Sequence, residues 1–265
     1  MYTHLSRLYD LYLKGQAVHY DLWHGDGRKR SVRALNRLFF GLVRITQPEL
    51  FIEAGAKDAR SSLRAKELSR NSRVVAFEAN PYNVEHYAAK HDYAALGVEY
   101  RHMALADGPQ ELPFYIRTAV KGKPIQKLTG RSSILKRLDP ETEYEAVAVP
   151  ADSIDNIFAG DPATTCAMWI DVEGASKEVL TGGSEWVSKA TCVMIEVEDS
   201  PKWENQWLSS DVMHFMLERG LVPIARDFEY KLQYNVVFAK DSVLSLPAVR
   251  THLDYFHSVW VNAGK

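Results

Sequence analysis

The chain has 265 residues, of which 46% are apolar and 25% charged, and its formal net charge is −2. This length suits one large α/β domain with added elements, or two small domains, and the near-neutral charge gives no general sign of nucleic-acid binding. No apolar run approaches the ~18 residues of a membrane span, and the N-terminus lacks the apolar core of a signal peptide. Cys166 and Cys192 lie in apolar segments, so they are expected to be buried thiols without a disulfide framework. We therefore expect a soluble cytoplasmic protein.

Residues 1–48 are predicted to form a helical extension ahead of the first strand. Apolar side chains recur at helical spacing in 5–13 and again in 35–43, on either side of an aromatic, His-rich and Gly-broken segment, 19–27. The extension carries eight Lys or Arg against three Asp, a local charge of +5. Two interpretations stay open: a substrate-facing lid over a nucleotide site, or a plain helical cap.

The stretch 50–81 has the pattern strand, Gly turn, helix, strand. The first apolar run ends in Glu53 and is followed by Ala54-Gly55-Ala56; the second ends in Glu78, 25 positions later. A Gly turn lets a ligand approach the backbone, and an acid at the end of the second strand can bind ribose hydroxyls. The pattern predicts a nucleotide-type site, against the alternative of an α/β domain whose strand ends happen to be acidic.

The rest of the chain alternates strands and helices. A helix is predicted over 82–95, a third strand over 98–105, a strand or hairpin arm over 112–116, a long polar loop over 117–145 and a short strand over 147–149. Two further core strands, 166–172 and 191–197, end beside Asp171, Glu173, Glu196 and Glu198. Strands over 221–226 and 234–239 are close enough in sequence to form an antiparallel hairpin, and the tail from 247 is predicted to be helical.

Several motifs resemble those of the FkbM-type methyltransferases, from about residue 50 to 240. They are Glu53-Ala54-Gly55-Ala56-Lys57-Asp58-Ala59, Ala76-Phe77-Glu78-Ala79-Asn80-Pro81, Ala104-Leu105-Ala106-Asp107, Ser132-Ser133-Ile134, Trp169-Ile170-Asp171-Val172-Glu173-Gly174 and Asn235-Val236-Val237-Phe238. The resemblance implies a Rossmann-like class I methyltransferase fold, an α/β protein with a mostly parallel seven-stranded sheet and an antiparallel terminal hairpin. Residues 49–265 would be the methyltransferase domain. Where the family has Asn, Gly and Lys, this chain has Lys57, Ala59 and Trp169.

The resemblance also implies S-adenosylmethionine as the cofactor. Gly55 would let it approach the backbone, since a Cβ there would collide with it. Glu53 and Asp171 would accept hydrogen bonds from its ammonium group, and Glu78 from its ribose. The adenine would lie between Met103 and Ala104 with Asp107 at its amino group, although a turn-forming Asp107 is an equal alternative. Ala56 and Ala79 complete the predicted cofactor-binding set.

Asp171, Glu173 and Glu196 are the predicted catalytic residues. They follow neighbouring strands, at the edge where open α/β sheets bind ligands. Glu173 or Glu196 would act as a general base or a metal ligand, the alternative being that Glu173 caps the following helix; no metal is assigned. His19, His24 and His102 are further candidate bases, each with a structural role as its alternative.

The predicted function is methyl transfer, most simply to a hydroxyl of a sugar, glycan or natural product. The altered first motif motivates an alternative, a cofactor-binding or partner-binding module without catalysis. An NAD-dependent oxidoreductase is disfavoured because the full Gly-x-Gly-x-x-Gly turn is missing and a terminal hairpin is present. The expected partner is a small-molecule or glycan acceptor, with no nucleic acid and no membrane span, and the oligomeric state stays open.

Overall fold

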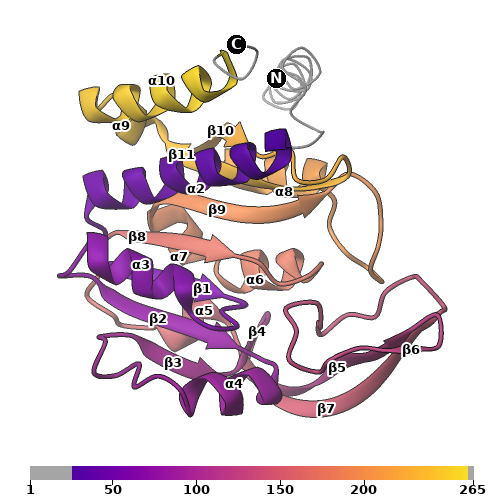
Figure 1. Ribbon diagram of the computed structural model, residues 1–265. Helices are drawn as coiled ribbons and strands as arrows, with labels where there is room; N and C mark the ends of the chain where they lie inside the picture. Colours follow the sequence, from indigo (N-terminus) through magenta and orange to yellow (C-terminus); the bar gives the residue numbers. More distant parts are fainter. Residues whose placement is uncertain (1–25, 262–265) are drawn as a thin grey trace.

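A seven-stranded sheet forms the centre of the protein (Figure 1). The computed structural model describes residues 26–261. Across the sheet the strands lie in the order β10 (Leu221–Arg226), β11 (Gln233–Lys240), β9 (Ala190–Glu198), β8 (Cys166–Ile170), β1 (Leu50–Ala54), β2 (Arg73–Glu78) and β3 (Glu99–His102). The strands from β9 to β3 pair in parallel, and β11 pairs antiparallel with both β9 and β10. The predicted mostly parallel sheet with an antiparallel terminal hairpin is confirmed.

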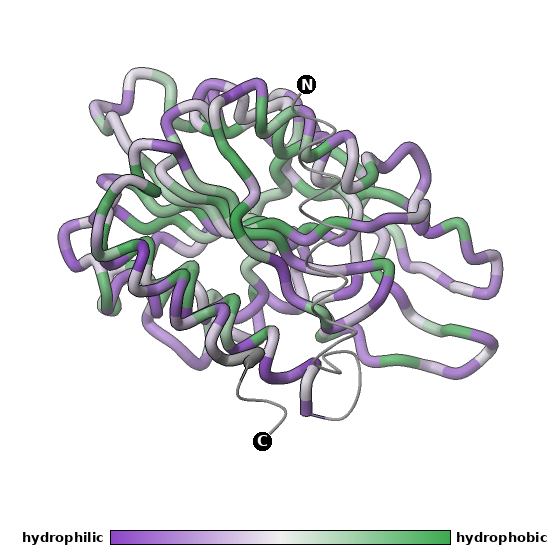
Figure 2. The backbone as a smooth tube through the Cα atoms, turned by 90° about the horizontal axis from the view of Figure 1, so that it is seen from above, coloured by the Kyte–Doolittle hydropathy of each residue, from purple (hydrophilic) through white to green (hydrophobic). Residues whose placement is uncertain are grey.

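Helices cover both faces of this sheet. One face carries α2 (Asp26–Thr46), α3 (Arg60–Leu68), α4 (Pro81–Ala88), α9 (Asp241–Leu244) and α10 (Pro247–Val261). The other carries α5 (Ile154–Ile157), α6 (Ser176–Gly182), α7 (Ser184–Lys189) and α8 (Ser209–Glu218). Figure 2 shows the hydrophobic segments gathered toward the middle and hydrophilic ones outside. All five residues of β1 are buried, as expected for a parallel strand covered on both sides.

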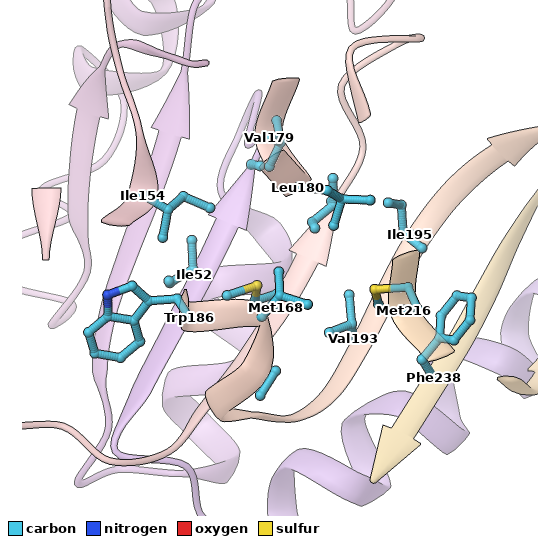
Figure 3. Close-up of a cluster of buried hydrophobic side chains, with 14 of the residues drawn as sticks. Ile52, Ile154, Met168, Val179, Leu180, Trp186, Val193, Ile195, Met216 and Phe238 are labelled. Atoms are coloured by element: carbon cyan, nitrogen blue, oxygen red, sulfur yellow. The ribbon is translucent and has the colours of Figure 1, made fainter. Parts of the chain in front are cut away.

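The core beneath α5–α8 fixes the central strands in place. Figure 3 shows Ile52, Met168 and Val193 from three adjacent strands packed with Val179 and Trp186 from the covering helices. Burying an aliphatic or aromatic side chain of this size contributes about 1.5–3 kcal/mol. This packing fixes the position of the central strands relative to the covering helices. Both cysteines are buried and unlinked, as predicted.

A smaller second sheet was not predicted from the sequence. Its strands lie in the order β4 (Ala104–Leu105), β7 (Thr142–Asp152), β5 (Gln110–Val120) and β6 (Lys123–Pro124). The predicted single strand over 98–105 is wrong, because the chain leaves the main sheet after His102 and pairs β4 with β7. The predicted loop over 117–145 is also too long, since β5 and β7 form a hairpin paired from 110 to 151. The half-exposed positions of this hairpin carry polar side chains, so its strands lack the apolar runs by which strands are recognised in a sequence.

The helix predicted around 35–43 is the second half of α2. Leu35, Leu38, Phe39, Leu42 and Val43 are buried against strands of the main sheet. The helix predicted before it and most of the segment 19–27 lie outside the described residues, and the domain boundary at 48 and the lid role stay predictions. The helix predicted over 82–95 ends already at Ala88. Within residues 26–261, no helix is both long and apolar enough to cross a membrane.

Candidate functional site

Most of the predicted site residues gather where β1, β2, β3, β8 and β9 end. Figure 1 shows these strands pointing the same way, so their carboxyl ends share one edge of the sheet. The chain leaves this edge through the turn 55–59 after β1, residues 79–80 after β2 and 171–175 after β8. Open α/β sheets bind ligands in the crevice at this edge.

The backbone conformation and a close backbone neighbour both require glycine at position 55. Its φ is +79°, and a Cβ would lie 1.8 Å from the backbone oxygen of Asp171. The sequence predicted a collision with the cofactor, but the close neighbour is the end of β8. The turn is also tied to β2, because Gly55 N and Ala56 N both donate to the Phe77 carbonyl, at 3.0 and 2.9 Å. The Gly turn thus fixes three strand ends against one another.

The Glu78 carboxylate links this turn to the residues that follow β2. Its carboxylate accepts hydrogen bonds from Lys57 N at 2.5 Å, Asn80 N at 2.7 Å and Asn83 Nδ2 at 3.3 Å. The side chain is only 5% exposed, and burial raises its pKa to about 7 against the pull of these donors. Glu78 lines the cavity described below, and much of the acceptor capacity of its carboxylate is already used.

Glu53 faces a different way. Its carboxylate accepts a hydrogen bond from Ser62 N, at the start of α3, at 2.8 Å, and burial raises its pKa to about 7. Glu53 does not line the cavity beside Glu78 but a groove on the other side of the Gly turn. The structure therefore separates the two acids that the sequence pattern paired. Asp171 lines both hollows.

A cavity of about 60 Å³ lies between the strand ends and the second sheet. The predicted residues that line it are Gly55, Glu78, Ala79, Met103, Ala104, Asp171 and Glu173. Phe114 of β5 also lines it, together with Thr129, Gly130 and Ser132–Ile134 from the segment between β6 and β7. Of these, only Ser132-Ser133-Ile134 had a sequence signal, its resemblance to a family motif. Ligand pockets typically enclose about 300–1,000 Å³, so this cavity is much smaller than a typical ligand pocket.

The segment 127–134 closes this cavity. Asn80 Nδ2 donates to the Lys127 carbonyl at 2.9 Å, and Asn83 Nδ2 donates to the Thr129 carbonyl at 3.0 Å. At its other end, Tyr115 N donates to the Ser133 carbonyl at 2.8 Å. These hydrogen bonds hold the segment against the start of α4 and against β5, beside the cavity.

Three acids meet beside the cavity. Carboxylate oxygens of Asp171, Glu173 and Glu196 lie within 4.8 Å of one another. Burial, reinforced by neighbouring carboxylates, raises the pKa of Asp171 to about 6 and of Glu173 to about 8, and holds that of Glu196 well above its usual range. Gln233 Nε2 donates to Glu196 at 2.9 Å, and Arg117 and Arg137 oppose the rise at Glu173. Such a cluster retains a proton near neutral pH and has the ligand types of a divalent-cation site.

Other predicted residues lie apart from the cavity. Asp107 is exposed and accepts a hydrogen bond from the Gln110 side chain, Nε2, at 2.9 Å. Ala56 lines the groove and not the cavity. His102 is exposed and contacts the Ala79 carbonyl through Nε2 at 3.1 Å. His19 and His24 lie outside the described residues.

Trp203 was missed by the sequence analysis. Its buried indole packs on Gly174, where a Cβ would lie 2.3 Å from Cδ1, and the Arg137 guanidinium lies over the ring at 4.9 Å. The indole therefore covers the turn that carries Glu173. No sequence pattern links a tryptophan in the loop after β9 to this turn.

Comparisons with known proteins connect this geometry to one family. The sequence profile of the family described as methyltransferase FkbM domain matches residues 53–223. No curated protein matches the chain.

Two solved structures illustrate the structural likeness. Methyltransferase FkbM from Methylobacillus flagellatus KT is 13% identical over 72% of this chain, with a TM-score of 0.45, and this chain covers 44% of its length. Magnesium protoporphyrin IX methyltransferase from Synechocystis PCC 6803, solved with bound SAM, is 10% identical over 80% of this chain and 79% of its own, with a TM-score of 0.43. This chain thus spans less than half of the Methylobacillus flagellatus protein.

Proposed function

This chain belongs to the methyltransferase FkbM family, and from that membership we propose that it is an S-adenosylmethionine-dependent methyltransferase acting on a hydroxyl group. The observation that carries the proposal is the meeting of Gly55, Glu78, Met103, Ala104 and Asp171 around one cavity. These residues lie at the carboxyl ends of β1, β2, β3 and β8 and at the start of β4, and all belong to the predicted cofactor-binding set.

The polar and apolar side chains that line the cavity suit this cofactor. Asp171 offers a carboxylate acceptor to a cationic ligand, and Glu78 offers one to a pair of hydroxyls. Met103, Ala104 and Phe114 supply an apolar wall for an aromatic base. The fit requires the segment 127–134 to move outward, because the cavity of about 60 Å³ is too small as it stands.

In this proposal the bound cofactor supplies a methyl group on a sulfonium, an electrophile open to in-line attack. The chain's own contribution is to orient the acceptor and to receive a proton. Glu173 and Glu196 lie at the strand ends where an acceptor would approach, and a raised pKa suits a base that works near neutral pH. The acceptor oxygen would lose its proton to this acid cluster as it bonds to the methyl carbon. Asp171 would hold the cationic end of the cofactor.

The hydroxyl acceptor is supported by the FkbM-type family resemblance, because such enzymes mostly methylate hydroxyls of sugars and natural products. A cofactor-binding or partner-binding module without catalysis is the second candidate. It is favoured by Lys57 and Ala59, which depart from the first motif of the family. Cofactor binding without turnover on any acceptor would support this second candidate.

The test is calorimetric titration of S-adenosylmethionine and S-adenosylhomocysteine into the wild type. We expect micromolar binding, weakened about tenfold by Glu78→Gln, which loses a charged acceptor. Glu111→Gln, an exposed acid on β5, is the matched control and should bind like the wild type. Glu173→Gln should also keep cofactor affinity while losing methyl transfer. Absence of binding of both ligands to the folded wild type would overturn the proposal.

A further inference from the structure

A second hollow lies on the other side of the Gly turn. It is a groove of about 900 Å³, bounded by Arg37 and Arg44 of α2, Lys57 of the turn, Arg60 and Arg64 of α3, and Trp169 of β8, and we call it the basic groove. Ligand pockets typically enclose about 300–1,000 Å³. The basic groove is therefore large enough for a small-molecule ligand, whereas the cavity beside Glu78 is not in its present closed form.

The basic groove reaches the candidate site. Gly55 and Asp171 line both the groove and the cavity. The same turn thus separates the two hollows, and a ligand lying in the groove ends beside the carboxyl end of β8. That edge also carries the acid cluster proposed to receive the acceptor's proton.

Positive charge dominates the groove wall. Five Lys or Arg side chains face three acids, and two of those acids are already engaged. Glu53 accepts from Ser62 N, and Asp58 is paired with Arg60 at 2.8 Å. Within the part of the chain that the structure describes, no ion pair joins an acid to Arg37, Arg44 or Lys57. Lys57 also attracts the carboxylate of the third acid, Asp171, whose pKa it lowers. Among the described residues, Arg37 and Arg44 are therefore the cations most open to an anionic ligand.

The floor of the groove is aromatic. Phe40 and Trp169 stack with ring centroids 5.7 Å apart at an interplanar angle of 23°, and both line the groove. Arg37 lies over the ring of Tyr255, 3.8 Å from its centroid. Phe40 and Trp169 are half-buried, and Phe39 also contacts the Trp169 ring edge-on at 5.6 Å. The accessible part of an aromatic ring beside guanidinium groups can bind a ring and an anion together. Trp169 and Lys57 are two of this chain's departures from the family motifs, and both line this one groove.

We propose that the basic groove binds the acceptor through a phosphate or diphosphate ester, with a ring of the same molecule against Trp169. Guanidinium groups of Arg37 and Arg44 bind the phosphate oxygens, a geometry that Arg supplies in bidentate form. That the bound molecule is the methyl acceptor rests on the proposed function. Anion binding in the basic groove does not depend on the proposed function.

The experiment is calorimetric titration of sodium pyrophosphate at fixed ionic strength into the full chain. The wild type binds, and Arg37→Gln/Arg44→Gln weakens binding about tenfold or more, as expected for the loss of two charged donors. The matched control is Arg33→Gln/Arg70→Gln, which removes two exposed arginines outside the groove. Comparing the affinities of uridine diphosphate and glucose 1-phosphate then distinguishes a nucleoside ring from a sugar ring. Trp169→Leu should remove the difference between these two affinities.

Equal pyrophosphate affinity in the two double variants would overturn the inference. S-adenosylhomocysteine titrated into the same preparations separates this result from the proposed function. If S-adenosylhomocysteine binds the wild type and pyrophosphate does not, the groove inference falls and the proposed function stands. If pyrophosphate binds and S-adenosylhomocysteine does not, the proposed function falls and the anion site stands. Thermal melts confirm that each variant is folded.

Discussion

Replacing Glu53 with glutamine is expected to stabilise the protein increasingly as the pH rises. Glu53 is 3% exposed, and burial raises its pKa from 4.5 to about 7. The opposing effects are a hydrogen bond from Ser62 N and the positive end of α3, both of which favour the carboxylate. Because the net shift of the pKa of Glu53 is upward, burial is the larger effect.

The sign of the pH dependence follows from linkage. Between pH 4.5 and 7 the folded chain holds a proton on Glu53 that the unfolded chain has lost, so stability falls as pH rises through this window. Above pH 7 the full cost applies, about 3 kcal/mol for a shift of this size. Glutamine carries no charge, and its side-chain oxygen can still accept from Ser62 N. The gain from Glu53→Gln should therefore grow by about 2.5 kcal/mol between pH 5 and pH 8.

The assay is urea unfolding of both proteins at several pH values between 5 and 8. Glu111→Gln, which removes an exposed acid, is the control and should give a difference that does not change with pH. A Glu53→Gln difference that is constant with pH would refute the argument. A variant that loses stability as pH rises would show that Ser62 and the helix outweigh burial.

Two further predictions concern the Gly turn and the closing segment. Gly55→Ala should lower the free energy of unfolding by about 2–5 kcal/mol, because alanine would have to adopt a left-handed φ and its Cβ would lie 1.8 Å from the Asp171 oxygen. A destabilisation of 1 kcal/mol lowers the melting temperature by at least about 2 °C. A melting temperature within about 2 °C of the wild type would therefore contradict this prediction. Asn83→Ala removes the hydrogen bond to the Thr129 carbonyl, so amide exchange across 127–134 should accelerate about tenfold while β1 and β8 stay protected. Unchanged exchange in that segment would show that other contacts hold it closed.

Much of the main sheet could be predicted from the sequence. Strands 50–54, 73–78 and 166–170 are nearly continuous apolar runs because both of their faces are buried, and such runs are recognisable without any partner. The acids at the strand ends were likewise correctly placed at one edge of the sheet. The second sheet was missed because β5 and β7 expose many polar side chains and pair over a long sequence separation.

The sequence by itself determined which chemical groups this protein brings to its candidate site: a Gly turn, acids at the ends of parallel strands, and the motifs of one family. Only the tertiary structure decided which of those groups meet. The pairing of β8 with β9 brings Glu196 to Asp171, whereas Glu53, predicted to act with Asp171 on one ligand group, instead accepts from Ser62 at the start of α3. The packing of α2 beside α3 places Arg37 and Arg44 on the same groove as Arg60 and Arg64. Patterns along a chain report local burial, but which side chains share a hollow depends on contacts between segments far apart in the sequence.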